Sequence, residues 1–243
     1  MSKNNVNIWG HHAVKAAWQN IDREIAIILL TENAVRDFTA FQSVKGVKRP
    51  APSIISKKEM DRMTNGGVHQ GMALKCNDLP ELFLSDILIK EKSKERSVIV
   101  ILDQVTDPHN VGAILRSACA FGAAGMILQR KHAPQMAGVL AKTACGALEH
   151  VPVILETNIS RAIEKLQEEN WMVYGLDERG EVEIGQVEKD SKIVLVMGAE
   201  GPGLRPNVAK HCDQLVRLDM KGPMPSINVS NAAAVSLYAL TSP

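Results

Sequence analysis

The stretch Val98-Ile99-Val100-Ile101-Leu102 is an unbroken run of apolar residues. Strands that face water on one side alternate apolar and polar residues, whereas strands buried on both faces of a parallel sheet are apolar throughout. The run therefore predicts a fully buried strand of a parallel sheet. A polar loop follows it, and the next apolar pattern predicts a helix over Val111–Phe121.

Apolar runs and helical patterns alternate from this strand towards the C-terminus. The predicted strands are Gly125–Leu128, Val151–Leu155, Trp171–Gly175, Ile193–Met197 and Gln214–Leu218, and the predicted helices are Ser160–Glu169 and Ser230–Leu240. Such alternation is typical of an α/β fold whose parallel sheet is covered on both faces. We therefore predict an α/β domain over residues 97–243.

The first 78 residues predict a smaller α/β domain. The predicted elements are a helix over Gly10–Asn20, a strand over Ile25–Leu30, a helix near Asn33–Ser43, and short strands over Ser53–Ile55 and Gly71–Lys75. Ser56 and Glu59 have the spacing of a capping box, which predicts the start of another helix. Residues 79–96 hold Pro80 and a run of mixed charge, so we predict that they form a linker.

Composition disfavours several classes of protein. The chain has 243 residues, of which 45% are hydrophobic, enough for a real core. No apolar run approaches the roughly 18 residues of a membrane span, and Met1–Asn5 lead into no apolar segment of a signal peptide. The cysteines Cys76, Cys119, Cys145 and Cys212 form no CxxC pair, which favours reduced core cysteines over a zinc site or disulfides. We therefore predict a cytoplasmic protein without a membrane segment or a bound metal.

Charge differs between the two predicted domains. Residues 1–78 hold 11 Lys and Arg against 7 Asp and Glu, whereas residues 97–243 hold 13 against 16. RNA phosphates would favour the basic N-terminal segment. An excess of this size is also ordinary for a solvated surface, so composition alone leaves RNA binding open.

Three polar loops follow predicted strands of the larger domain. They are Leu102–Arg116, Val196–Arg205 and Leu218–Ala232. Ligands of open α/β sheets bind at the carboxyl ends of strands, so these loops form the candidate site. In the first loop we expect Asn110 and Arg116 to be presented on the same side. Taken one at a time, each loop is also explained as a capped helix or a glycine-rich turn.

Familiar cofactor and nucleophile motifs are missing from the sequence of this domain. Neither Val98–Leu102 nor Ile193–Met197 is followed by GxGxxG, which disfavours a nicotinamide enzyme and an ordinary Rossmann methyltransferase. No Gly-Lys-Ser/Thr follows the glycines of the second loop, and no GxSxG elbow of a hydrolase is present. No cluster of His and Cys supports a metal.

The three loops, in this order, resemble the three motifs of the SpoU family of the SPOUT methyltransferase superfamily. The first motif corresponds to residues 107–118, the second to 198–204 and the third to 226–232. The first block also resembles the family's small N-terminal substrate-binding domain, which is similar to a ribosomal protein. Asn7–Val14 and Val68–Gly71 carry that part of the likeness.

The resemblance implies an enzyme that transfers a methyl group from S-adenosyl-L-methionine to the 2′-hydroxyl of an RNA ribose. Within the family, the chain is most similar to bacterial enzymes that methylate a guanosine in the peptidyl-transferase region of 23S rRNA. The family fold further implies a trefoil knot near the C-terminus, formed by the second and third loops. It also implies a homodimer with active sites at the subunit interface.

The motifs also imply roles for single residues. The matches to catalytic positions are Asn110, Arg116, Glu200, Ser226 and Asn228, and the matches to cofactor-binding positions are Gly198, Leu218 and Ile227. Arg116 is often assigned as the base in this family, but arginine stays protonated in proteins. We therefore expect Arg116 to clamp the phosphate beside the target ribose, while the proton leaves through that phosphate or water. Asn110 and Glu200 would orient the arginine, and Ser226 would contact the ribose or the cofactor.

Two other functions stay open at this point. A tRNA 2′-O-methyltransferase of the same family is the nearer alternative, although the N-terminal domain favours rRNA. A non-catalytic RNA-binding protein is the more remote alternative. The complete set of motif residues argues against it.

Overall fold

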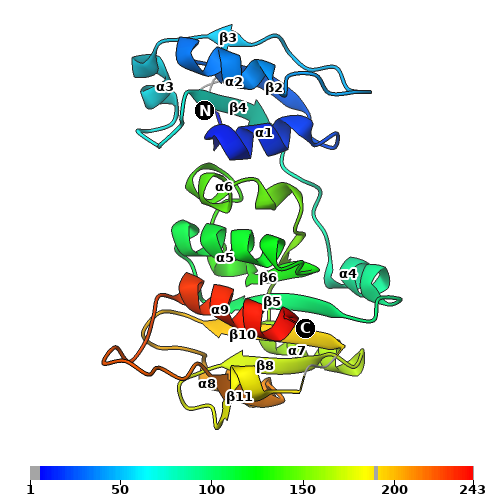
Figure 1. Cartoon of the computed structure of the whole chain (residues 1–243). Helices are drawn as coiled ribbons and strands as arrows, with labels where there is room; N and C mark the ends of the chain where they lie inside the picture. Colours follow the sequence, from blue (N-terminus) through cyan, green and yellow to red (C-terminus); the bar gives the residue numbers. More distant parts are fainter. Residues whose placement is uncertain (1–5, 189–190, 243) are drawn as a thin grey trace. The chain divides into compact units, whose positions relative to one another are not determined.

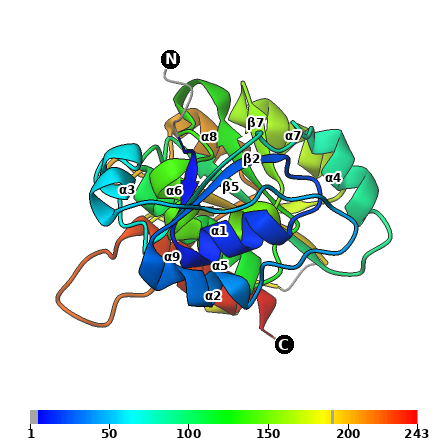
Figure 2. The same ribbon diagram turned by 90° about the horizontal axis from the view of Figure 1, so that it is seen from above.

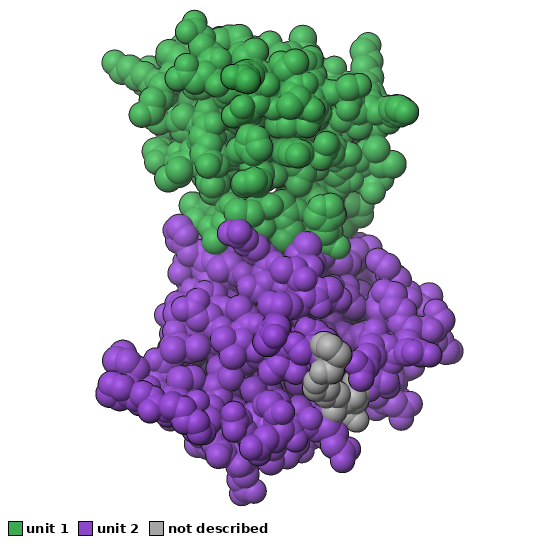
Figure 3. Space-filling model, in the orientation of Figure 1, with its two compact units in different colours: residues 1–80, 135–150 green, residues 81–134, 151–243 purple. Residues whose placement is uncertain are grey.

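The computed structural model describes residues 6–188 and 191–242, and it consists of two compact units. Unit 1 combines residues 1–80 with 135–150, and unit 2 combines residues 81–134 with 151–243 (Figure 3). The sequence interpretation of Met1–Asn5 lies outside the described residues. The division into domains of residues 1–78 and 97–243 with a linker over 79–96 stays a prediction.

Unit 2 is built on a seven-stranded parallel sheet, as predicted. The strand order is β7-β6-β5-β10-β8-β11-β9. The strands are β5 (Ser97–Asp103), β6 (Gly125–Gln129), β7 (Val153–Glu156), β8 (Met172–Leu176), β9 (Val182–Glu183), β10 (Lys192–Gly198) and β11 (Gln214–Arg217). Every residue of β5 is buried, which explains its unbroken apolar run. The short strand β9 was not predicted.

Helices cover both faces of this sheet. They are α4 (Leu84–Glu91), α5 (Pro108–Ala120), α7 (Ile159–Glu168), α8 (Pro206–His211) and α9 (Val229–Thr241). On one face, α4, α7 and α8 join a core cluster with alternate residues of the strands, such as Ile99 and Ile101. On the other, α5 and α9 pack together, as Figures 1 and 2 both show. The segment predicted to be a linker thus contains a helix, whose Leu84 and Ile87 are buried.

Unit 1 is a smaller α/β unit with a mixed sheet of order β1-β4-β2-β3, in which β2 and β3 run parallel and the other described pairs run antiparallel. Its elements are β1 (Ile8–Trp9), α1 (His11–Gln19), β2 (Ile25–Leu30), α2 (Val35–Thr39), β3 (Ser53–Ile54), α3 (Lys57–Met63), β4 (Met72–Cys76) and α6 (Gly138–Ala144). The capping box of Ser56 and Glu59 is confirmed.

One predicted helix of unit 1 is wrong in its bounds. The helix expected near Asn33–Ser43 is only the short α2, which follows a 3₁₀ turn over Glu32–Ala34. The Thr39 hydroxyl donates to the Val35 carbonyl oxygen at 2.8 Å at the end of α2.

The segment 135–150 is joined to the rest of unit 1 by buried contacts. Arg23 and Glu149 form an ion pair at 2.9 Å, and each side chain is only 3% exposed. Asn20 donates a further hydrogen bond to Glu149 at 2.7 Å. Gly146 approaches α1 so closely that a Cβ there would lie 2.7 Å from the Cβ of Ala16. Residues more than a hundred positions apart therefore form one small core, which local periodicity does not predict.

The four cysteines carry no disulfide in the structure. Cys76 is buried and the other three are half-buried, as expected for reduced core residues. Burial raises the pKa of the Cys212 thiol to about 12, so this thiol stays protonated near neutral pH. Among the described residues, no helix combines the length and apolar character that a membrane crossing requires.

Candidate functional site

The sheet order places the motif loops side by side. Strands β5, β10, β8 and β11 are consecutive neighbours in the sheet and run parallel, so their carboxyl ends lie along one edge. The first motif follows β5, the second follows β10 and the third follows β11. Segments that are 28 to 118 residues apart in the chain therefore meet at this edge, where open α/β sheets bind ligands.

Glu200 is the centre of a hydrogen-bond network that joins the three motifs. Its Oε1 accepts from Asn110 Nδ2 at 3.2 Å, from Asn228 Nδ2 at 2.5 Å and from the Val229 amide at 3.4 Å. Asn228 Nδ2 also donates to Asn110 Oδ1 at 3.1 Å. Three residues that the sequence analysis selected are thus brought into direct contact.

The same Asn228 caps helix α9. Its Oδ1 accepts from the Ser230 amide at 2.8 Å, which satisfies a donor at the start of the helix. Because its amide group donates to Asn110 and Glu200 while its carbonyl oxygen caps the helix, the side chain is fixed from both ends. The capping interpretation of this loop is therefore confirmed, and the same side chain also joins the network of the three motifs.

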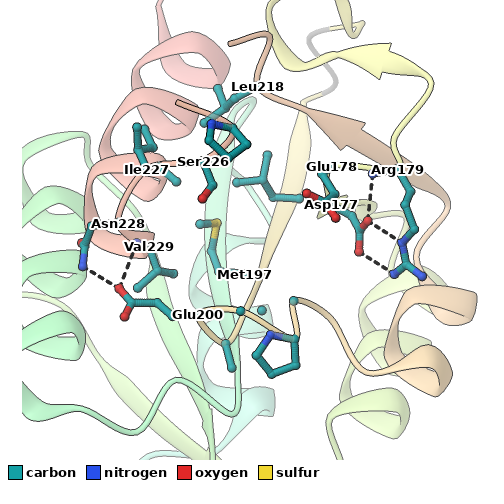
Figure 4. A pocket seen from close by; sticks show the side chains of 18 of the residues that line it. Asp177, Glu178, Arg179, Met197, Glu200, Leu218, Ser226, Ile227, Asn228 and Val229 are labelled. Atoms are coloured by element: carbon teal, nitrogen blue, oxygen red, sulfur yellow. Dashed lines mark hydrogen bonds and ion pairs between the residues drawn. The ribbon is translucent and has the colours of Figure 1, made fainter. Parts of the chain in front are cut away.

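A pocket of about 740 Å³ lies beside this network. Its volume is within the range of about 300–1,000 Å³ that small-molecule sites occupy. Met197, Leu218 and Ile227 supply apolar surface, and Gly198–Gly203 supply accessible backbone. In Figure 4, Glu200, Asn228 and Val229 lie on one side of the pocket, and Asp177, Glu178 and Arg179 lie on the opposite side.

Most of the predicted site residues line this pocket. They are Gly198, Glu200, Leu218, Ser226, Ile227 and Asn228. Position 198 requires glycine for a steric reason, because a Cβ there would lie 2.2 Å from the carbonyl carbon of Gly203. The glycine-rich loop therefore folds back on itself more tightly than a side chain at 198 permits.

The end of this loop is anchored to strand β5 by a buried carboxylate. Asp103 is the last residue of β5, and its side chain is 0% exposed. It accepts from the Arg205 amide at 3.0 Å and from Arg205 Nε at 2.7 Å. The pair ties the strand before the first motif to the residue after the second. Both residues lie in the candidate loops, but the sequence analysis gave neither of them a role.

Arg116 lies apart from the network, contrary to the expectation that it shares a side with Asn110. Both residues are in helix α5, where positions six apart differ by about 120° in direction. Asn110 bonds to Glu200, whereas Arg116 is exposed and forms no ion pair with another residue of the described chain. Glu200 does not orient the arginine in this structure. Arg116 presents its charge outward.

Asp177, Glu178 and Arg179 line the pocket but were not predicted. They follow β8, the strand between β10 and β11. Asp177 is buried and holds an ion pair with Arg179 at 2.7 Å. Hydrogen bonds from the Arg179 side chain hold the pKa of this carboxyl below its ordinary value, so it is ionised at neutral pH. The sequence pattern that could have identified them is the cluster of charged residues directly after the predicted strand Trp171–Gly175.

The parallel sheet, the edge network and the adjacent pocket define an α/β protein with a ligand-sized cavity at the carboxyl ends of its strands. The model of the SpoU rRNA methylase family matches residues 97–238, and a model for RNA 2′-O ribose methyltransferase substrate binding matches residues 7–82. The chain belongs to the SpoU family.

Similar proteins come from several bacteria. The chain is 37% identical over 235 residues to a 23S rRNA (guanosine-2′-O-)-methyltransferase of Pseudomonas putida, with 95% of this chain and 94% of the relative covered. It is 36% identical to an uncharacterized tRNA/rRNA methyltransferase of Synechocystis over 96% of this chain, and it spans 61% of that longer relative.

Solved structures share the fold. The SpoU methyltransferase AviRb of Streptomyces viridochromogenes, crystallised with the cofactor AdoMet, superposes with a TM-score of 0.76 at 20% identity. That match covers 97% of this chain and 88% of the other. An rRNA methyltransferase of Sinorhizobium meliloti gives a TM-score of 0.75 at 23% identity, covering 97% and 86% of the two chains.

Proposed function

We propose that this protein transfers a methyl group from S-adenosyl-L-methionine to the 2′-hydroxyl of a guanosine ribose in 23S rRNA. The observation that carries the proposal is the network of Asn110, Glu200 and Asn228 beside the pocket. It unites the three family motifs at one edge of the sheet. The named activity of the Pseudomonas putida relative supports the choice of reaction and substrate.

The residues of the pocket fit S-adenosylmethionine. Backbone at Gly198, Leu218 and Ile227 would hold the adenine edge with amide donors and carbonyl acceptors, while Met197 and Leu218 offer apolar surface to the ring. The cofactor would supply a methyl group already activated by the positive sulfonium. The protein must therefore mainly position the ribose oxygen and remove its proton.

Arg116 would act as a clamp on the phosphate next to the target ribose. Its side chain is exposed on α5 and has no carboxylate partner among the described residues. A guanidinium binds phosphate through two parallel hydrogen bonds and does not lose its proton at neutral pH. The ribose proton would leave through the phosphate or water. Ser226 lines the pocket and would contact the ribose or the cofactor.

Glu200, Asn110 and Asn228 would position the loops around the reacting groups. The network fixes the second motif against the starts of α5 and α9. We further propose that the enzyme is a cytoplasmic homodimer with sites at the subunit interface, that its C-terminal loops form a trefoil knot, and that unit 1 binds rRNA. The match of residues 7–82 to a substrate-binding family supports the last point.

The experiment is to map 2′-O-methyl groups on 23S rRNA from cells with and without this protein, and to repeat the methylation in vitro with purified enzyme. We expect one guanosine mark in the peptidyl-transferase region to disappear in the deletion strain and to be restored in vitro. Loss of a mark on tRNA instead would favour the tRNA alternative. An unchanged RNA methylation pattern would contradict both proposals.

A further inference from the structure

The geometry points to Asp177 as a ribose-binding residue of the cofactor pocket, held in place by Arg179. This inference rests on the proposed function, because it specifies which chain group would hold the sugar of S-adenosylmethionine. The starting observation is that a carboxylate with only 4% of its side chain exposed lines a pocket of about 740 Å³.

The position of Asp177 in the sheet places it between the two proposed adenosine-binding segments. It follows β8, and β8 lies between β10, which ends at Gly198, and β11, which precedes Leu218. The Asp177 amide donates to the Val216 carbonyl oxygen at 2.9 Å, which fixes the turn against β11. A sugar attached to an adenine held at Gly198 and Leu218 must lie near the strand between them.

The acceptors of Asp177 are only partly used by the protein. Oδ1 accepts from the Arg179 amide at 3.0 Å and from Arg179 Nε at 2.7 Å, which fills its two lone-pair positions. Oδ2 accepts from Arg179 Nη2 at 2.7 Å, which leaves its second lone pair able to accept a hydrogen bond from a ligand. A Cβ at Gly203 would lie 3.7 Å from Oδ2, so the missing side chain leaves room beside this oxygen.

The charge of Asp177 favours a neutral donor. Arg179 balances the carboxylate within the pair, so the pair has little net charge to attract the ammonium group of the methionine part. A ribose hydroxyl is a neutral donor, and carboxylates bind ribose hydroxyls in other nucleotide sites. The free position on Oδ2 therefore fits one ribose hydroxyl of the adenosine.

The test is calorimetric binding of S-adenosylhomocysteine and of its 2′-deoxy and 3′-deoxy forms to the full chain. We expect the wild-type chain to bind at least one deoxy form ten-fold or more weakly, because Oδ2 then lacks its donor. Asp177→Asn should bind the natural ligand more weakly and show little further loss with that deoxy form. A residue with a merely structural role would weaken all three ligands by the same factor.

The matched control is Asp213→Asn. Asp213 accepts from the Val173 amide at 2.8 Å near the other end of β8 and does not line the pocket. This variant should discriminate between the ligands as the wild type does. Equal affinity of the wild type for all three ligands would overturn the inference without any variant, even if Asp177→Asn fails to fold. Absence of all binding by the folded wild type would instead contradict the proposed function itself.

Discussion

The start and the middle of helix α5 hold two polar side chains in opposite situations. Asn110, in the first turn, is bonded to Glu200 and Asn228, which belong to the other two motifs. Arg116, six residues later, is exposed and unpaired within the described chain. One helix thus has one polar side chain inside the network and another in solvent. Under the proposed function, the first turn would hold the loops in place and the exposed cation would bind the substrate phosphate.

The largest effect is expected from Arg116→Ala. If Arg116 clamps the substrate, methyl transfer should fall about 100-fold or more while cofactor affinity and the melting temperature stay unchanged. Arg116→Lys should keep part of the activity, because lysine keeps the positive charge but cannot make the two parallel hydrogen bonds of a guanidinium. Single-turnover methylation of an rRNA fragment measures this, with Arg161→Ala, an exposed arginine on α7, as control. If the rate rises steeply with pH in Arg116→Lys but not in the wild type, the residue at position 116 would instead act as the base.

The anchor at Asp103 should show its effect in stability. Asp103→Asn weakens charge-assisted bonds of a fully buried carboxylate, so we expect the free energy of unfolding to fall by about 1.5–3 kcal/mol. Denaturant unfolding is the measurement. Asp107→Asn is the matched control, because Asp107 caps α5 and asparagine caps helices equally well. Equal losses in the two variants would mean that burial of Asp103 does not matter.

A third variant tests the network itself. Glu200→Ala removes the acceptor for Asn110, Asn228 and the Val229 amide, so the second motif should loosen. Because these groups are largely open to solvent, we expect cofactor affinity to fall only about ten-fold. Unlike Arg116→Ala, this variant should weaken binding as well as rate. Glu168→Ala, an exposed acid on α7, is the control, and unchanged cofactor affinity in Glu200→Ala would refute the positioning role.

The smallest effect is expected from a single cation of unit 1. Lys15 is exposed on α1, and Lys15→Gln should weaken RNA binding a few-fold if unit 1 contacts phosphate. The slope of log affinity against log salt should become shallower by roughly 0.7–0.9 for one lost phosphate contact. Binding of an rRNA fragment at several salt concentrations measures it. An unchanged slope in Lys15→Gln, with a reduced slope in Arg116→Ala, would place the phosphate contacts on unit 2.

The strands of unit 2 were predictable because burial on both faces leaves a local trace. The fully buried β5 is apolar at Val98–Leu102, and β10 is apolar at Ile193–Met197. The capping box of Ser56 and Glu59 was equally local. Helix α6 left no comparable pattern in the sequence, because it has only seven residues and these mix apolar and polar side chains. The direction of Arg116 was misjudged because six positions are not a whole number of helical turns.

The sequence by itself determined the buried strands, the capped helix starts and the three loops that carry the family motifs. These features depend on periodicity and side-chain chemistry within a dozen residues. Only the tertiary structure decided that β8 lies between β10 and β11, and so that Asp177 enters the pocket. It also decided that Glu149 is buried against Arg23. The physical reason is that apolar strands can pair with many partners, and the choice depends on contacts between residues far apart in the chain.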